Sequence, residues 1–199
     1  MRSFLLIILF SAYAALSTTA ADFDPLAASI DENLRHPAVP AKAAPAVSSA
    51  MNQLVRTLRN AGYTVQGVRN GEVVMVTIPA SELFAPGATT LKSTSQPKLR
   101  GLLPYVQRTD NYKVIVAAHS DNTGDELYND RLTADRANAV DEYFFNLNNS
   151  TETGIIPYGL GYDEPVAPNN SVQSRARNRR IEVYFVPTAE YIDKIKKRR

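Results

Sequence analysis

Asp121 and Arg136 are the two residues of this sequence best placed to act together on a ligand. Asp121 follows a predicted strand over residues 113–118, in which residues 114–117 are apolar, so we expect it at the end of a buried strand, where sheets of this type present ligand sites. Thr133 is a suitable N-cap for the next helix, which would place Arg136 in its first turn beside free backbone N–H groups. A spacing of 136 − 121 = 15 residues lets the intervening loop return, so the carboxylate and the guanidinium would lie side by side.

Such a pair of opposite charges suits a zwitterionic ligand. Arg136 can bind a carboxylate through two parallel hydrogen bonds, while Asp121 accepts from an ammonium group. Each charge-assisted bond is worth roughly 1.5–3 kcal/mol. The spacing alone leaves another interpretation open, in which the two residues form a purely structural ion pair that ties the loop to the helix.

The composition excludes several kinds of chemistry. The chain has no cysteine and two histidines, which rules out disulfides, thiolate zinc sites, cysteine nucleophiles and multi-histidine metal sites. His119, Ser120 and Asp121 are hydrolase residue types, but neighbours on a strand point to opposite faces and cannot form a triad. Gly124 is misplaced for a calcium-binding loop of the EF-hand type. We therefore expect no enzymatic activity, no cofactor and no metal.

The periodicity of the apolar residues predicts alternating helices and strands. Asn70-Gly71 between residues 63–68 and 73–78 is a strong signal for a hairpin, because both turn residues tolerate a positive φ. The sequence predicts an α/β (α+β) fold with a mixed sheet and helices packed on it. The expected helices begin near residues 48, 95 and 133, and the other expected strands cover residues 113–118, 155–160 and 181–186.

Both ends of the chain differ in composition from its middle. Arg2, the apolar run that follows and the small residues before position 22 are typical of a signal peptide over residues 1–21. Residues 22–47 are rich in alanine and proline and predict a flexible to semi-extended linker. We expect a helix and a lead-in strand over residues 48–70, the main domain over residues 71–187 and a basic C-terminal tail over residues 188–199. Residues 194–199 would be solvated, while Tyr191, Ile192 and Ile195 would cap the domain or stay loose. Export makes nucleic acid an improbable partner despite this basic end.

Four motifs in order carry a resemblance to a known family. The run H-S-D-x-x-G-x-x-x-x-N-x-x-L-T-x-x-R-A over residues 119–137 resembles the signature of OmpA-like peptidoglycan-associated domains. The other motifs are Phe84-x-x-Gly87-x-x-x-Leu91, Gly159-x-Gly161-x-x-x-Pro165 and N-R-R-I-E-V over residues 178–183. The resemblance implies a β-α-β-α-β-β mixed sheet with helices packed on it.

The resemblance also implies a ligand and a set of site residues. OmpA-like domains bind the peptide stem of peptidoglycan non-covalently, and Asp121 and Arg136 match the positions that bind its diaminopimelate residue. Asn129 and the backbone near Ser120 and Leu132 would shape the site. Arg179 matches a basic motif near the pocket, with a less direct role.

A place in the cell follows from the same resemblance. It implies an exported protein of the periplasm, associated with the outer membrane and the cell wall. Since the chain has no cysteine for lipid attachment, a membrane tether would be an outer-membrane protein partner, and a homo-oligomer would also strengthen retention. Two alternatives remain at this point: an envelope scaffold that uses the fold to bind another protein, and binding of anionic lipid through residues 194–199.

Overall fold

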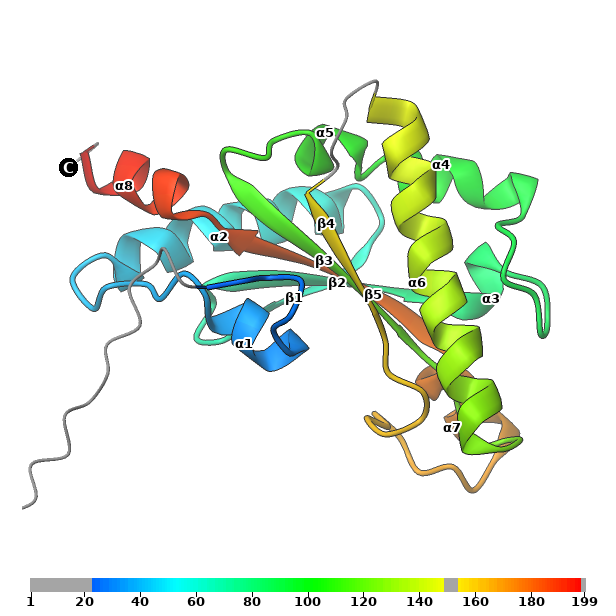
Figure 1. Cartoon of the computed structure of the whole chain (residues 1–199). Helices are drawn as coiled ribbons and strands as arrows, with labels where there is room; N and C mark the ends of the chain where they lie inside the picture. Colours follow the sequence, from blue (N-terminus) through cyan, green and yellow to red (C-terminus); the bar gives the residue numbers. More distant parts are fainter. Residues whose placement is uncertain (1–22, 149–153, 198–199) are drawn as a thin grey trace, which may run out of the picture.

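A five-stranded mixed sheet forms the centre of the molecule in the computed structural model, which describes residues 23–148 and 154–197 (Figure 1). The expected signal peptide lies outside the described residues. The spatial order is β1-β2-β5-β3-β4, with β3 and β4 parallel and the other neighbouring pairs antiparallel. The strands are β1 (Thr64–Val68), β2 (Val73–Pro79), β3 (Tyr112–His119), β4 (Ile155–Gly159) and β5 (Arg180–Pro187).

The helices cover the sheet unequally. The larger core lies on one face, beneath α2 (Ala44–Asn60), α4 (Gln96–Arg100), α5 (Leu103–Val106) and α6 (Glu126–Asn148). The second face carries a smaller apolar cluster beneath α1 (Ile30–Arg35). The remaining elements are α3 (Ala80–Leu83), the 3-10 turn η2 (Ser93–Ser95), α7 (Val172–Asn178) and α8 (Ala189–Lys197). From β2 onward this is the predicted β-α-β-α-β-β mixed sheet, so the fold class is confirmed.

The predicted hairpin joins β1 to β2. Arg69, Asn70 and Gly71 have φ values of 52°, 57° and 79°, and Val68 pairs with Val73 across the turn. The loop is therefore longer than a two-residue turn, but Asn-Gly occupies the left-handed positions that it tolerates well.

β3 is buried on both faces, as its apolar sequence predicts. Val114, Val116 and Ala118 pack in the larger core, while Ile115 and Ala117 pack in the smaller cluster. This double burial fixes the strand in the sheet and so fixes the position of Asp121, two residues beyond its end.

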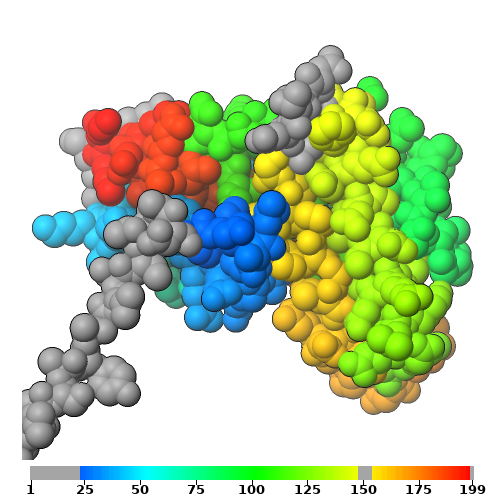
Figure 2. Space-filling model, in the orientation of Figure 1, coloured from blue at the N-terminus to red at the C-terminus, as the bar shows by residue number. Residues whose placement is uncertain are grey.

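The N-terminal segment differs from the flexible linker expected over residues 22–47. Ser29 and Glu32 form a reciprocal capping box at the start of α1, and α2 begins at Ala44. We call residues 24–39 the strap, because they cross the second face of the sheet. In Figure 2 the blue α1 region lies against the yellow segment that contains β4. The segment is ordered, and not the predicted flexible linker, because the strap is held by contacts with residues distant in the chain.

Asn33 is the centre of those contacts and has no exposed surface. Its side-chain amide donates to Pro25 O (2.6 Å) and to the Tyr158 hydroxyl (2.7 Å). The Lys113 ammonium donates to Asn33 Oδ1 (2.9 Å), to Asn33 O (2.6 Å) and to His36 O (2.6 Å). Burial lowers the pKa of Lys113 to about 8. The strap is thus held by buried polar bonds as well as by apolar contacts.

Replacing Asn33 with alanine should lower the free energy of unfolding by about 2 kcal/mol, because it leaves buried partners without their hydrogen bonds. Urea unfolding of the purified protein measures this difference. Asn138→Ala, at an exposed position on α6, is the control and should stay within about 0.5 kcal/mol of the wild type. Equal stability of Asn33→Ala and the wild type would show that the strap contributes little.

The predicted basic tail forms a helix, α8, over Ala189–Lys197. α8 packs its Ile192, 3% exposed, into the larger core, and the Tyr191 ring lies edge-on to Tyr112 with centroids 5.4 Å apart. Lys194 forms ion pairs with Glu190 (2.9 Å) and Asp110 (3.7 Å). Apolar residues at helical spacing hold this helix on the domain, while its lysines remain on the surface. Within the described ranges, none of the helices is long and apolar enough to cross a membrane.

Candidate functional site

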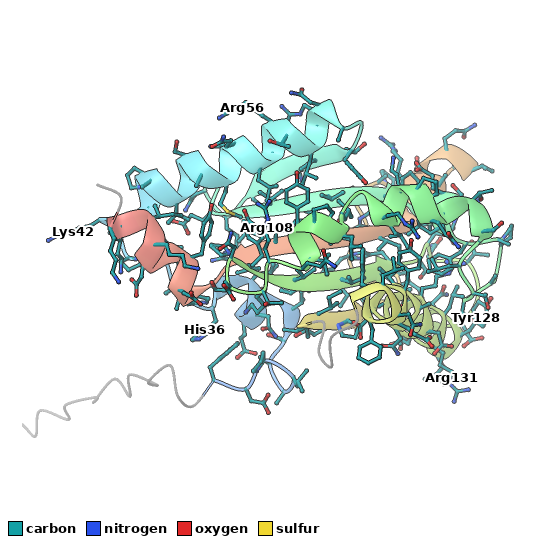
Figure 3. The ribbon with its side chains drawn as sticks, turned by 90° about the horizontal axis from the view of Figure 1, so that it is seen from above. His36, Lys42, Arg56, Arg108, Tyr128 and Arg131 are labelled. Carbon is teal, nitrogen blue, oxygen red and sulfur yellow. The ribbon has the colours of Figure 1, made fainter. Side chains whose placement is uncertain are left out.

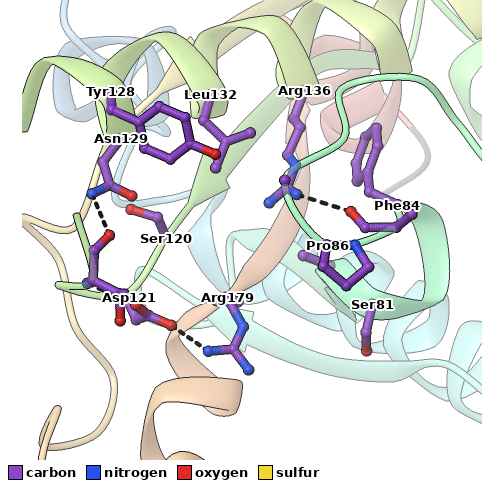
Figure 4. A pocket seen from close by; sticks show the side chains of 14 residues that line it. Ser81, Phe84, Pro86, Ser120, Asp121, Tyr128, Asn129, Leu132, Arg136 and Arg179 are labelled. Carbon is purple, nitrogen blue, oxygen red and sulfur yellow. Dashed lines mark hydrogen bonds and ion pairs between the residues drawn. The ribbon is translucent and has the colours of Figure 1, made fainter. Parts of the chain in front are cut away.

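A pocket of about 390 Å³ opens beyond the end of β3 (Figure 4). Four parts of the chain enclose it: α3 with the loop that follows it, the loop between β3 and α6, the first half of α6, and Arg179 just after α7. All six residues predicted for the site line this pocket: Ser120, Asp121, Asn129, Leu132, Arg136 and Arg179. The other lining residues are Ala80, Ser81, Phe84, Ala85, Pro86, Gly87, Thr123 and Tyr128.

The helix that carries Arg136 begins earlier than predicted. α6 starts at Glu126, where Asp125 Oδ1 accepts a hydrogen bond from the Tyr128 N–H (2.9 Å) and so caps the first turn. Thr133 lies inside the helix, fully buried, and its hydroxyl donates to Asn129 O (2.8 Å). The prediction that Thr133 is the N-cap is therefore wrong. Arg136 stands ten residues into α6, away from the free N–H groups of the helix end.

Two glycines let the chain after β4 approach α6 closely. A Cβ on Gly159 would lie 2.3 Å from Ala134 N, so only glycine fits between the strand and the helix. Gly161, with a φ of +47°, donates its N–H to the Thr133 hydroxyl (3.0 Å) and accepts at its carbonyl from Ser120 N (2.7 Å). The G-x-G motif therefore connects the pocket end of β3 with α6.

Asp121 is paired with Arg179, not with Arg136. Its carboxylate accepts from the Arg179 guanidinium and from the backbone N–H of Thr123 (2.8 Å). Burial by itself would raise the pKa of Asp121, but the hydrogen bonds from Thr123 and Arg179 lower it overall. Asp121 is therefore ionised at neutral pH. Its side chain lines the wall of the pocket, and the residue is 4% exposed.

Arg136 is also 4% exposed, and its contacts are of a different kind. Its guanidinium donates to Ala88 O (2.9 Å) and Ala85 O (3.4 Å) and lies 5.0 Å from the centroid of the Phe84 ring. Across the described parts of the chain, no carboxylate lies within ion-pair distance of it. Burial lowers the pKa of Arg136, but an arginine stays charged at physiological pH. The pocket thus holds a buried cation that lacks an anionic partner from the described residues.

Asn129, Ser120 and Leu132 have different roles in the pocket. The Asn129 amide donates to the backbone carbonyls of Thr123 and Asp125, both at 3.0 Å, and so holds the loop between β3 and α6. The Ser120 hydroxyl is buried and has no hydrogen-bond partner among the described residues. Leu132 contributes apolar surface.

Sequence reasoning missed two aromatic residues of the pocket. Phe84 is 2% exposed and stacks beneath Arg136, whereas Tyr128 is 49% exposed at the rim. Two features of the sequence could have indicated them: Phe84 begins the Phe84-x-x-Gly87 motif, and Tyr128 is the aromatic residue between Gly124 and Asn129. With Pro86 and Leu132, these rings give the space between the charged groups an apolar lining.

A buried polar network lies behind the pocket. Arg180 Nε donates to Glu182 Oε1 (2.7 Å), and Glu182 Oε2 accepts from the Tyr184 hydroxyl and lies 3.2 Å from His119 Nε2. His119 directly precedes Ser120 at the end of β3, so this network supports the strand end that carries the site. Among the residues described, no group of three or more His, Cys, Asp or Glu side chains could hold a metal ion.

Comparison with known proteins supplies independent information about this pocket. Residues 83–179, which include every residue of the pocket except Ala80 and Ser81, match the model of the OmpA family. Over 130 residues the chain is 28% identical to the probable lipoprotein YiaD of Escherichia coli (strain K12), an alignment that covers 65% of this chain and 58% of that relative. The chain thus spans a little over half the length of this curated relative.

Two solved structures share the fold. A putative MotB-like protein from Desulfovibrio vulgaris has a TM-score of 0.63 at 24% identity, with 72% of this chain and 94% of that chain covered. The cell wall anchor of the T6SS from Pseudomonas aeruginosa has a TM-score of 0.57 at 28% identity, with 67% and 94% covered. The first likeness shows the fold alone.

Proposed function

Residues 83–179 of this chain are an OmpA-family domain, and from that premise we propose that the protein binds peptidoglycan non-covalently and anchors the cell envelope to the wall. The observation that carries the proposal is the buried guanidinium of Arg136, which lacks a carboxylate partner in the described structure and lines the same pocket as the ionised Asp121. A buried charge without a counter-charge is costly, so a ligand carboxylate would be strongly favoured there.

The proposed ligand group is the diaminopimelate of the peptide stem. Its free end carries an ammonium group and a carboxylate on one carbon, and methylene groups separate this end from the peptide chain. We assign the carboxylate to Arg136 and the ammonium to Asp121, which would share its charge between the ligand and Arg179. Phe84, Pro86 and Leu132 would contact the methylene groups.

The mode of action we propose is retention without covalent chemistry. Each charge-assisted bond is worth roughly 1.5–3 kcal/mol, and association itself costs several kcal/mol, so one stem should bind with modest affinity. The wall repeats the same ligand, so an oligomer or an outer-membrane partner would multiply retention. A place in the periplasm, at the outer membrane and the wall, agrees with the descriptions of two relatives, one a probable lipoprotein and one a cell wall anchor.

Co-sedimentation with purified sacculi that contain diaminopimelate tests the proposal. Wild-type protein should pellet, whereas Asp121→Asn and Arg136→Ala should lose at least about tenfold in affinity and stay in the supernatant, because each removes a charge that contacts the ligand. Arg56→Ala, an exposed position on α2, is the matched control for loss of a positive charge and should pellet like the wild type. Circular dichroism establishes that each variant is folded.

Two outcomes would contradict the proposal. If the wild type and both pocket variants pellet alike, retention does not use the pocket and the buried charges have a structural role. If the folded wild type does not pellet at all, the domain does not bind this wall, and an envelope scaffold that binds another protein becomes the better description.

A further inference from the structure

A second groove, of about 480 Å³, lies beside the pocket on the second face of the sheet. Its floor is formed by side chains of β1, β2 and β5, among them Gln66 and Thr77, and its wall by α7. Ser81 lines both the groove and the pocket, so the two hollows adjoin at this residue. A chain that leaves the pocket over Ser81 therefore enters this groove.

The charged groups of the groove differ in how far they are already neutralised. Arg180 and Glu182 are buried and paired with each other at 2.7 Å, so neither is available to a ligand. Arg177, on α7, is exposed and makes no hydrogen bond or ion pair with any residue of the described ranges. The groove thus offers one available cation, a few residues along the chain from Arg179 in the pocket.

The proposed ligand carries an anionic group at a matching place. In a peptidoglycan stem the residue before diaminopimelate is a glutamate linked through its side-chain carboxyl, which leaves its α-carboxylate free. One residue of extended chain spans roughly 3.5 Å, and the longer side-chain linkage reaches further. A stem that leaves the pocket at Ser81 would therefore carry this carboxylate into the adjoining groove. The pocket has a net charge of +1 from Arg136, Arg179 and Asp121, and Arg177 adds a second positive charge. An anionic stem is therefore complementary in charge to the pocket and to the groove.

We propose that Arg177 binds this free α-carboxylate and makes the protein selective for stems in which it is not amidated. The inference rests on the proposed function and deepens it: the ligand extends from the pocket over Ser81 into the groove, with one carboxylate at Arg136 and a second at Arg177. Arg177 acts on specificity, while the main binding energy comes from the pocket.

Two synthetic tripeptides test the assignment: L-Ala-γ-D-Glu-diaminopimelate, and the same peptide with the glutamate α-carboxylate amidated. Calorimetric titration of the full chain at low salt should show the wild type binding the free-acid peptide about fivefold more tightly, as expected for one partly exposed ion pair. Arg177→Gln should reduce this preference to less than twofold and leave the affinity for the amidated peptide unchanged. Arg177→Lys, which keeps the positive charge, should show a preference for the free-acid peptide between those of Arg177→Gln and the wild type.

The matched control is Arg56→Gln, which removes the same charge from α2, on the opposite side of the molecule from Tyr128 at the pocket rim (Figure 3). This variant should keep the full fivefold preference. Equal binding of the two peptides by the wild type, or an undiminished preference in Arg177→Gln, would overturn the role of Arg177 while leaving wall binding intact. Failure of the wild type to bind either peptide or sacculi would instead overturn the proposed function itself, and this inference with it.

Discussion

Gly159→Ala should lower the free energy of unfolding by about 3 kcal/mol or more and should also abolish binding to sacculi. The added Cβ would lie 2.3 Å from Ala134 N and 2.6 Å from Ala134 Cα, distances at which the backbones of β4 and α6 must separate. Forced overpacking of this kind typically costs 1–3 kcal/mol, and a clash between two backbones belongs at or beyond the upper end. Because α6 carries Asn129 and Arg136, its displacement would also move one wall of the pocket.

Guanidinium unfolding and a thermal scan measure this effect. A loss of about 3 kcal/mol corresponds to a decrease in Tm of roughly 6–12 °C for a chain of this size. Gly67→Ala, on the edge strand β1, is the matched control. Its added Cβ would lie 3.4 Å from the nearest atom, Gly71 Cα, which is an ordinary contact distance, so this substitution should leave the free energy of unfolding nearly unchanged. A Gly159→Ala protein within 1 kcal/mol of the wild type would show that β4 and α6 adjust without cost.

Glu182→Gln should destabilise the protein at neutral pH by about 3 kcal/mol. The substitution removes a carboxylate that is 4% exposed and that pairs with Arg180, itself 4% exposed, so a buried guanidinium loses its counter-charge. Removing one partner of a buried ion pair typically costs 3–5 kcal/mol. Glu142→Gln, at an exposed position on α6, changes the net charge equally and should be almost neutral.

The pH dependence of stability gives a second and sharper readout for Glu182. Burial opposes ionisation, but bonds from His119 and Tyr184 and the charge of Arg180 lower the pKa of Glu182 from 4.5 to about 2. A carboxyl whose pKa is lower in the folded state stabilises the fold above its unfolded pKa and loses that contribution as the pH falls toward the folded value. Wild-type stability should therefore fall by about 3 kcal/mol between pH 5 and pH 2 on account of this group.

The variant should lack most of that decrease, so the two proteins should converge in stability near pH 2. Urea unfolding at intervals of half a pH unit measures both curves. Parallel curves for the wild type and Glu182→Gln would show that Glu182 does not hold a lowered pKa in the folded protein.

The fold was largely predictable because its signals are local. An apolar run on both faces specifies β3 as a central strand, and Asn70-Gly71 specifies the hairpin through the conformations that those two residues tolerate. The strap was not predictable in this way. Its order depends on Asn33 meeting Lys113 and Tyr158, residues distant in the chain whose arrangement no local pattern encodes.

The residues lining the pocket were predictable, but their pairing was not. Asp125 and Thr133 are both good N-cap residues, but Asp125 caps the first turn of the observed helix. The Thr133 hydroxyl, inside the helix, accepts instead from the Gly161 N–H. Asp121 and Arg136 line one pocket as the motif implies, yet the carboxylate pairs with Arg179, 58 residues further along the chain. Short spacing favoured Arg136 as the partner, whereas the sheet brings the start of β5 beside the end of β3.

The placement of the strap and the pocket at the two ends of β3 has a mechanical consequence. The Lys113 side chain holds the strap near the first residues of the strand, and a ligand at Asp121 would be held just beyond its last residue. Tension between the strap and the wall would enter the sheet at Lys113 on β3 and at Tyr158 on β4, and β3 is bonded to β5 on one side and β4 on the other. A pull parallel to a strand loads its inter-strand hydrogen bonds in shear, so they must fail together and cannot be peeled apart one at a time. The strand that presents the pocket is thus also the one best suited to bear a load.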